Sequence, residues 1–395
     1  MSSTIPARPA PAPARPSAPA SDLAPGHDPA PEPSPVPGSL SAPGPRSSPA
    51  YVYDLAELDA HVRAVRAALG DVELYYAVKA NPDPELLRTL VPYVDGFEVA
   101  SGGELAHVRE HAPHVPVALG GPGKTDAELL ADVTRLHVES PGELRRLLAS
   151  GRPADVLLRV NLDIAVEGAA LAMGGGATPF GMDPAGVDEC VALLGSQEAV
   201  RLRGVHAHLA SGLDAPRMLE LAAAILDYAR TLGVTEINLG GGMAVSYTDP
   251  GDRFDWEAYG RGLAALRRPG ETLRIEPGRS LTVYCGRYVT HVIDVKRVHG
   301  ELFAIVAGGT HHLRTPATKG HDQPVLVPRT GEPITIVGQL CTPKDVLARR
   351  VPIALKAGDR VEFTMAGAYA WNISHHDFLM HPRPVFHYLN GPDSS

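Results

Sequence analysis

Short apolar runs alternate with helix-length stretches of mixed polarity between residues 71 and 280. Most of these runs end in a polar residue or a glycine cluster, as buried strands of a parallel sheet do. Eight such runs occur, at residues 74–79, 96–101, 115–120, 136–140, 156–161, 202–209, 236–241 and 273–278. The helical stretches between them include residues 103–111, 127–130, 141–150 and 216–232. Eight consecutive strand–helix units predict an α/β fold, a TIM-like (β/α)8 barrel, and favour it over an open doubly wound sheet.

The segments on either side of this pattern predict a second domain, built of β-strands. Residues 51–53 form a β-type run, and Asp54 is placed to cap a helix that ends near Gly70. After residue 280, β-type runs follow at residues 281–289, 302–306, 325–327, 334–337 and 360–363, with a helical piece near residues 345–350. Turns rich in Gly, Pro and Asp divide them. We expect a mostly antiparallel β domain over residues 281–390, joined by the strand and helix of residues 49–70.

Composition and charge limit the kinds of partner. Residues 1–48 are largely Pro, Ala and Ser, so we expect a disordered tail, with a Pro-rich ligand for a partner protein as the alternative. The 395 residues carry a net charge of −9 without a cluster of Lys and Arg, which argues against nucleic-acid binding. No apolar run is long enough to span a membrane, and the three widely spaced cysteines suit a reducing compartment. These features predict a cytoplasmic protein.

The candidate chemistry begins at Lys79, which ends the first barrel run. A TIM barrel builds its active site at the carboxyl ends of its strands. A lysine there is costly to bury unless it is paired or has reacted, and it can form a Schiff base with an aldehyde. The alternative is a lysine whose amine simply reaches solvent from the end of a strand.

Further polar residues end the last three barrel runs. The glycines of Gly240–Gly242 allow close approach of backbone N–H groups to an anion, and Arg279 adds a guanidinium, so both predict a phosphate site; a plain tight turn is the alternative for the glycines. With Lys79 in reach, the phosphorylated aldehyde pyridoxal phosphate fits, and Glu276 would hold the proton on its ring nitrogen. His206 and His208 share one face and are a metal pair, satisfied core histidines or, for His208, a ring that stacks on the cofactor. No third ligand is evident, so we predict no metal site.

Taken together and in this order, these motifs resemble the fold-type III pyridoxal-phosphate decarboxylases, which include the ornithine, diaminopimelate and arginine decarboxylases. The resemblance covers residues 50 to 385. It rests on Ala77-Val78-Lys79-Ala80-Asn81, on His208 with Ser211-Gly212, on Gly240-Gly241-Gly242, on Glu276-Pro277-Gly278-Arg279, and on Cys341 followed by Asp345. It implies a barrel plus a β domain and a homodimer with two shared active sites.

The resemblance also implies a role for each matching residue. Lys79 would be the Schiff-base lysine, His208 would stack on the cofactor ring, and Glu276 would pair with the ring nitrogen. Cys341, supplied by the partner subunit, would protonate the carbanion after CO2 leaves; a small buried side chain is the alternative for this cysteine. The phosphate would be held by Ser211, Gly240, Gly241, Gly242, Gly278, Arg279 and Tyr369.

Two acids that the diamine-forming members of this family use are missing. The position after the cysteine is Thr342, and the preceding loop, residues 307–314, contains His311, His312 and Arg314 instead of an aspartate. Donors and positive charge suit a carboxylate-bearing substrate, which these residues and Asp345 would bind. The chain is most similar to the branch that decarboxylates citryl-diaminopropionate in siderophore assembly.

Three other functions remain open on the sequence. The first is decarboxylation of diaminopimelate or another diamino acid. The second is amino-acid racemisation on the same barrel, although racemases of this fold place an arginine, not an acid such as Glu276, at the ring nitrogen. The third is a catalytically inactive homologue with a regulatory role.

Overall fold

The computed structural model describes residues 48–164, 171–172, 174, 176–195, 197–314 and 321–389. The predicted disordered tail, residues 1–48, lies outside this part of the chain except for Ser48. Within the described residues, no helix combines the length and the apolar character needed to cross a bilayer.

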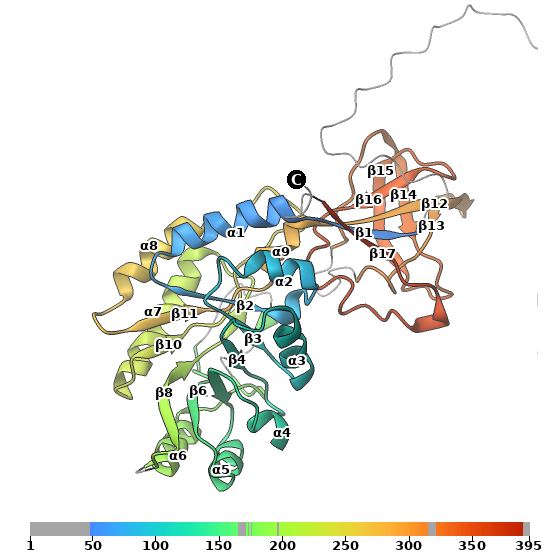
Figure 1. Ribbon diagram of the computed structural model, residues 1–395. Coiled ribbons are helices and arrows are strands. Elements are labelled where there is room, and N and C mark those ends of the chain that lie inside the picture. The colour runs from blue at the N-terminus through green and yellow to red at the C-terminus, as the bar shows by residue number, and fades with distance from the viewer. Residues whose placement is uncertain are drawn as a thin grey trace, which may run out of the picture. The chain divides into compact units, whose positions relative to one another are not determined.

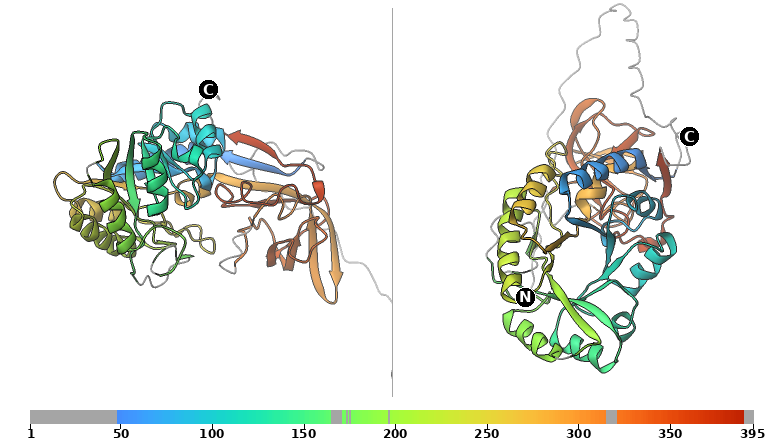
Figure 2. Two further views of the ribbon diagram at one scale, coloured as in Figure 1. Left: turned by 90° about the horizontal axis from the view of Figure 1, so that it is seen from below. Right: turned by 60° about the vertical axis from the view of Figure 1, so that its left-hand side comes forward.

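Eight parallel strands close into a barrel, as the sequence predicts (Figure 1; Figure 2, right). Each strand pairs with its neighbours in chain order, and the last, β11, pairs with the first, β2. The strands are β2 Glu73–Ala77, β3 Gly96–Val99, β4 Val117–Leu119, β5 Arg135–Val138, β6 Ala154–Arg159, β8 Val200–His206, β10 Glu236–Asn238 and β11 Thr272–Ile275. A small ribbon of β7 Leu171–Ala172 and β9 Ala210–Ser211 lies outside the barrel wall.

Helices follow the barrel strands in the alternation that the sequence predicts. Seven of them begin at an Asp, Ser or Thr whose side chain accepts a backbone N–H of the first turn, which stabilises a helix start: α2, α3, α4, α5, α6, α7 and α8. Their bounds are α2 Pro84–Leu90, α3 Gly102–His111, α4 Asp126–Leu129, α5 Pro141–Ala149, α6 Pro184–Leu194, α7 Ala215–Thr231, α8 Trp256–Leu266 and α9 Arg279–Thr282. Helix α1, Leu55–Leu69, is capped by Asp54 as expected, and it packs against α2 and α8 of the barrel.

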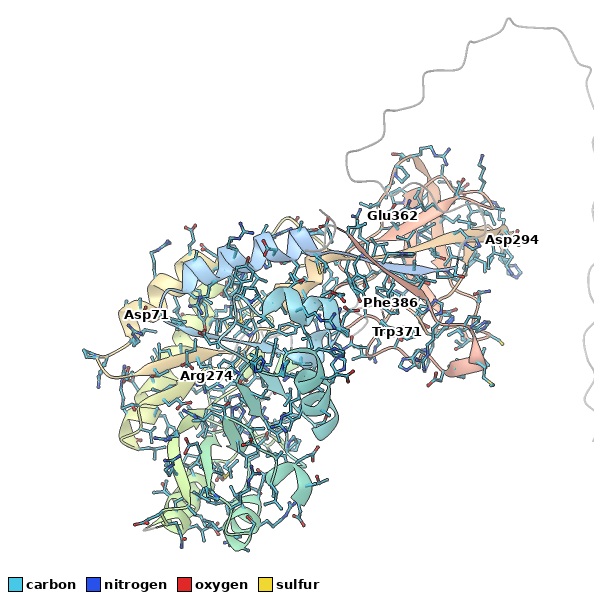
Figure 3. All side chains as sticks on the ribbon, in the orientation of Figure 1. Asp71, Arg274, Asp294, Glu362, Trp371 and Phe386 are labelled. Atoms are coloured by element: carbon cyan, nitrogen blue, oxygen red, sulfur yellow. The ribbon has the colours of Figure 1, made fainter. Side chains whose placement is uncertain are left out.

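The second body is a seven-stranded sheet, mostly antiparallel as predicted. Its path runs β15–β14–β13–β12–β1–β17, with β16 also paired to β12; the β1–β17 and β13–β14 pairs are parallel. The strands are β1 Ala50–Asp54, β12 Gly286–Val298, β13 Glu301–Val306, β14 Thr330–Val337, β15 Val346–Ile353, β16 Arg360–Phe363 and β17 Val385–Leu389. β1 therefore joins a sheet whose other strands all follow the barrel in sequence. Phe386 of β17 and Trp371 lie in this part of the molecule (Figure 3).

Three local predictions were wrong. The helix expected near residues 345–350 is part of strand β15, because its apolar residues pack into the sheet rather than along a helix face. The strand expected at 281–289 begins only at Gly286, after α9 and a 3₁₀ turn. The run at 325–327 forms an isolated bridge, between Val325 and Phe363.

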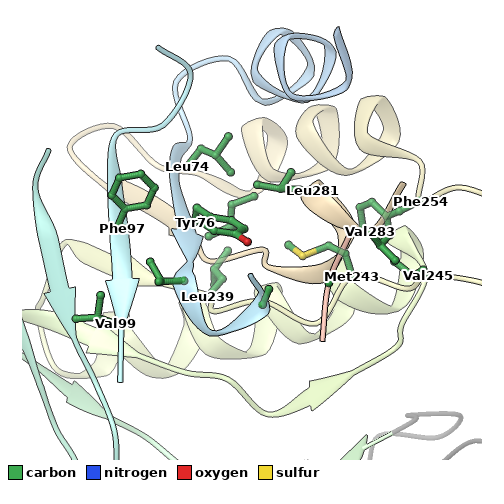
Figure 4. Close-up of a cluster of buried hydrophobic side chains, with 14 of the residues drawn as sticks. Leu74, Tyr76, Phe97, Val99, Leu239, Met243, Val245, Phe254, Leu281 and Val283 are labelled. Atoms are coloured by element: carbon green, nitrogen blue, oxygen red, sulfur yellow. The ribbon is translucent and has the colours of Figure 1, made fainter. Parts of the chain in front are cut away.

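The core joins the barrel wall to the helices around it. Figure 4 shows Leu74, Tyr76 and Phe97 of neighbouring strands packed with Leu281. All four side chains are almost completely buried. Burial of such apolar side chains supplies the main favourable term for folding.

The inside of the barrel, in contrast, contains charged side chains. Alternate residues of each strand point inward, and at the amino-terminal end these are charged. Arg274 donates to both Glu73 and Glu236, and Arg135 donates to Glu236 through its Nε at 2.8 Å. The ring of Tyr75 covers the Arg274 guanidinium at 4.4 Å. This ionic layer fills the barrel interior at the amino-terminal ends of the strands.

Replacing Glu236 with alanine should lower the free energy of unfolding by about 3–5 kcal/mol, because two arginines would lose a largely buried partner. Urea unfolding measures this loss. As a matched control, Glu257→Ala removes an exposed glutamate paired with Arg261 four residues along α8, and should change the value by less than about 1 kcal/mol. Equal effects of the two substitutions would contradict a stabilising role for the layer.

Candidate active site

A cavity with a volume of about 410 Å³ opens where the barrel strands end. This is within the usual size range of sites for small molecules. Ten of the residues predicted from the sequence line it together: Lys79, His208, Ser211, Gly241, Gly242, Glu276, Gly278, Arg279, Arg314 and Tyr369. The structure thus brings together residues from six different segments of the chain.

Lys79 lies in a 3₁₀ turn, Val78–Ala80, just after β2 rather than within the strand. Its Nζ is 2.5 Å from Oε2 of Glu98, a buried residue of β3. Burial lowers the pKa of Lys79, but the charge of Glu98, with smaller contributions from Tyr369 and Glu276, raises it above its ordinary value. The amine is therefore held as an ammonium until it reacts or moves.

Glu98 is a site residue that the sequence analysis missed. Burial raises the pKa of its carboxyl group, and the charge of Lys79 opposes that shift. Because a buried carboxylate is costly without a partner, the two groups stabilise each other. The sequence feature that could have indicated Glu98 was an acid inside an otherwise apolar strand, Gly96–Val99.

Glu276 follows β11, the strand that pairs with β2, and lines the cavity. Its two oxygens accept separate hydrogen bonds, one from Nδ2 of Asn238 at 2.6 Å and one from Nε2 of His206 at 3.0 Å. Both donors are uncharged when His206 is neutral, and burial lowers the pKa of His206 well below its ordinary value. The two hydrogen bonds therefore orient the carboxyl group without pairing it with a cation.

His208 is oriented by two neighbours. The backbone N–H of Gly241 donates to its Nδ1 at 3.2 Å, so its Nε2 carries the proton and faces the Ser211 hydroxyl at 3.4 Å. Burial, followed by the charges of Lys79 and Arg159, lowers the pKa of His208 to about 4. The ring is neutral at physiological pH, which suits stacking on an aromatic cofactor.

The triple glycine is required by close backbone packing. A Cβ on Gly241 would lie 2.4 Å from the carbonyl oxygen of Glu276, and one on Gly242, at φ +114°, would lie 2.2 Å from that of Ala210. The N–H groups of Gly240 and Gly241 already donate to Asn238 and His208. Both N–H groups are therefore used within the turn, so neither is free to donate to a phosphate as the sequence predicted. Gly240 does not line the cavity.

Arg279 supplies the positive charge for an anion. Its guanidinium lies over the ring of Tyr369 at 4.8 Å and over that of Tyr247 at 5.7 Å, and Nη1 is 3.5 Å from the Tyr247 hydroxyl. Within the described ranges, it forms no ion pair with a carboxylate. A cation held between two aromatic rings and left uncompensated is suited to bind phosphate.

Four predicted substrate residues lie outside the cavity of this chain, as does Cys341. Cys341 is exposed, and so is the neighbouring Thr342 in part. Oδ1 of Asp345 accepts the backbone N–H and the hydroxyl of Thr310, and its Oδ2 accepts the N–H of Leu340. Asp345 therefore joins two loops and has no oxygen turned toward a substrate of its own chain.

The two adjacent histidines are also buried away from the cavity. His312 donates from Nε2 to the carbonyl of Pro382, and its Nδ1 lies 3.0 Å from the Tyr288 hydroxyl. His311 is completely buried, and neither ring nitrogen has a hydrogen-bond partner. Of the substrate residues predicted from this loop, only Arg314 reaches the cavity.

His311 should make the protein sensitive to acid. Burial, followed by the nearby His312 and His381, lowers the pKa of His311 to about 3 from an ordinary 6.5. Between these two values the unfolded chain binds a proton that the folded chain does not, so stability falls as pH decreases, by up to about 1.4 kcal/mol per pH unit. We expect His311→Leu to flatten the fall in Tm between pH 7 and pH 4.5.

The matched control for this prediction is His114→Leu, at an exposed position, which should leave the pH slope unchanged. An unaltered slope in His311→Leu would show that the histidine is protonated in the folded protein.

The cavity contains what pyridoxal phosphate requires of a protein. It has an amine for the aldehyde in Lys79, a free guanidinium for the phosphate in Arg279, and a buried carboxylate for the ring nitrogen in Glu276. His208 adds a neutral ring between them. These features define a site for a pyridoxal-phosphate enzyme.

Comparison with known proteins gives the family. The family model of the pyridoxal-dependent decarboxylases, pyridoxal binding domain, matches residues 55–283. The chain is 39% identical over 373 residues to a 2-[(L-alanin-3-ylcarbamoyl)methyl]-2-hydroxybutanedioate decarboxylase of Staphylococcus aureus, covering 86% of this chain and 93% of that protein. It is 35% identical over 347 residues to a diaminopimelate decarboxylase of Actinosynnema pretiosum, covering 81% and 79%.

Solved structures agree on the fold. The diaminopimelate decarboxylase of Helicobacter pylori in complex with L-lysine matches with a TM-score of 0.79 at 23% identity, covering 87% of this chain and 92% of that one. The chain belongs to the pyridoxal-phosphate-dependent decarboxylase family. It is an amino-acid decarboxylase that uses pyridoxal phosphate.

Proposed function

We propose that this enzyme decarboxylates an amino acid conjugated to a carboxylate-rich acid, such as citryl-diaminopropionate in siderophore biosynthesis. The observation that carries the proposal is the charge of the cavity lining. Both acids of the described lining are engaged, Glu98 by Lys79 and Glu276 by His206 and Asn238. The distal ammonium of ornithine or lysine would find no free carboxylate there.

Cations, in contrast, are available in the cavity. Arg314 lines its mouth and forms no ion pair within the part of the chain that the structure describes. Arg159 lines the wall, with Nη1 bonded to Glu139 at 2.7 Å. Arginine binds carboxylates through paired N–H groups, so this lining suits a tail with several carboxylates. The Staphylococcus aureus relative acts, by its name, on citrate joined through an amide to diaminopropionate.

The residues divide the work as follows. When bound, pyridoxal phosphate supplies an electron sink for the carbanion left by loss of CO2. Lys79 would hold the cofactor, and Glu98 would hold the Lys79 ammonium whenever it is not bound to the cofactor. Glu276 keeps the proton on the ring nitrogen, because opposite charge favours the charged form. Arg279, with Ser211, Gly242, Gly278 and Tyr369, would hold the phosphate.

We also propose that the active enzyme is a cytoplasmic homodimer with shared active sites. A proton must be returned to the carbon that loses CO2, yet no cysteine lines the cavity of the described chain. Cys341 is exposed, so Cys341 of the partner subunit can supply that proton across an interface. Exposed apolar side chains follow one another in the segment that begins at Ile373, which lines the cavity, and they suit such an interface: Ile373, Phe378, Leu379 and Met380.

Release of CO2 from a panel of substrates tests the substrate. The panel contains citryl-diaminopropionate, free diaminopropionate, ornithine, lysine and diaminopimelate at equal concentration. We expect kcat/KM for the conjugate to exceed the others by at least about 10²-fold. Arg314→Met should raise KM for the conjugate more than it changes kcat. Faster turnover of a plain diamino acid would refute the proposed substrate.

A further inference from the structure

Three barrel strands direct buried polar side chains at Glu276. His206 ends β8, Asn238 ends β10, and His137 lies in β5. All three are buried, as is Glu276. The rings of His137 and His206 stack with centroids 4.2 Å apart and planes 13° apart. Burying polar side chains this deeply costs free energy unless they are hydrogen-bonded.

The two hydrogen bonds to Glu276 fix the rotation of its carboxylate. The Oδ1 of Asn238 accepts the N–H of Gly240 at 3.0 Å, so its amide is oriented and its Nδ2 must face Glu276. His206 must donate from Nε2, because a carboxylate only accepts. Its Nδ1 is then an acceptor, and it has no partner. Nothing in the surrounding described residues competes with Glu276 for the His206 proton.

His137 differs from His206 in its contact with the carboxylate. Its Nε2 lies 3.8 Å from Oε1 of Glu276, beyond hydrogen-bond distance, and it has no partner. Its ring instead supports the face of His206. Two neighbouring histidines therefore share burial and packing, but only one of them bonds to Glu276.

We propose that His206 is a positioning residue for the cofactor: its Nε2–H holds Glu276 so that the charged carboxylate faces the ring nitrogen and keeps that nitrogen protonated. His137 only packs against the ring of His206. The proposal rests on the role proposed above for Glu276. It adds a residue that acts through Glu276 and touches neither substrate nor reacting atoms.

A metal site is the rival explanation, since ligand atoms of His137, His206 and Glu276 lie within 4.8 Å of one another. The stacking argues against it. Nearly parallel rings 4.2 Å apart direct their nitrogen lone pairs side by side, whereas a tetrahedral ion needs them to converge. The 3.0 Å contact between His206 and Glu276 is a hydrogen bond that an inserted ion would break.

The test compares two matched substitutions, His206→Phe and His137→Phe. Each replaces a buried histidine by an aromatic ring of similar shape, and only the first removes a hydrogen bond to Glu276. The readout is the ¹⁵N NMR signal of the ring nitrogen in protein loaded with ¹⁵N-labelled pyridoxal phosphate, which reports protonation without substrate. Cofactor affinity is measured in parallel by titration of the apoprotein.

We expect wild type and His137→Phe to give the signal of a protonated nitrogen. His206→Phe should shift the signal toward the unprotonated form at the same pH, and weaken cofactor binding by about 10- to 100-fold. His206→Gln, whose amide can still donate, should restore most of both. His206→Met provides the same test should the phenylalanine variant not fold.

Two results would overturn the proposal. One is a wild-type signal in the folded His206→Phe or His206→Met protein. The other is an equal shift in His137→Phe, which would assign the effect to packing. Stoichiometric metal in the purified protein, lost in both variants, would overturn it in favour of the metal site. The variant Glu276→Gln separates the role of Glu276 from that of His206. An unshifted signal in Glu276→Gln refutes the proposed role of Glu276. A shifted signal in Glu276→Gln, together with an unshifted one in His206→Phe, refutes only the role of His206.

Discussion

Replacing Lys79 with alanine should lower decarboxylation by more than about 10⁴-fold, because Lys79 is the proposed point of covalent attachment of the cofactor. The protein should still fold, since the side chain opens into the cavity rather than into the core. Glu98 would lose its partner, so some loss of stability should accompany the loss of activity. Initial rates of CO2 release measure the effect.

A second measurement identifies the cause. Wild-type protein should retain the visible absorbance of its cofactor through gel filtration, and Lys79→Ala should lose it. Lys79→Arg keeps a positive charge beside Glu98 but cannot condense with the aldehyde, so it should be stable and equally inactive. Lys296→Ala, an exposed position on β12, is the control and should behave as wild type. Retention of the absorbance by Lys79→Ala would place the attachment on another residue.

Replacing Cys341 with alanine should lower kcat by about 10²- to 10⁴-fold, the usual contribution of a well-placed general acid. Cofactor binding should be unaffected, because the residue lies outside the cavity that holds the cofactor. Cys190→Ala, in a buried helical position remote from the cavity lining, controls for the loss of a thiol and should remain active.

Mixing the two inactive variants tests whether the thiol crosses a subunit interface. A dimer with one Lys79→Ala and one Cys341→Ala subunit has one site with both defects and one site with neither. Random exchange makes half of the dimers mixed, so about a quarter of wild-type activity should return. If subunit exchange is verified and no activity returns, the shared site is ruled out. A monomeric active enzyme would also rule it out.

The barrel could be predicted from the sequence because its strands are continuous apolar runs with charged or glycine-rich ends. Lys79 follows the first of those runs, and Glu276 and Arg279 follow the last, so their meeting in one cavity follows from the closed barrel. Glu98 could not be assigned, because it lies inside a strand and its role appears only when β3 is placed beside the turn that carries Lys79.

The β domain was harder to interpret. Its strands are short and their partners are distant, so pattern alone did not separate the strand β15 from a helix. Asp345 and His312 carry functional groups suited to a substrate, and only the structure shows that backbone atoms already occupy them. A polar residue in a candidate loop needs its hydrogen-bond partners known before it can be assigned.

The place of β1 in the sheet has a consequence for biosynthesis. Tyr51 hydrogen-bonds to the carbonyl of His312, 261 residues further along the chain, and β1 lies between β12 and β17. A growing polypeptide therefore emerges with an apolar strand whose pairing partners are absent until the entire barrel has been translated. Nascent chains halted before residue 286 should expose that strand to chaperones, and late termination should be far more damaging than the small size of the missing piece suggests.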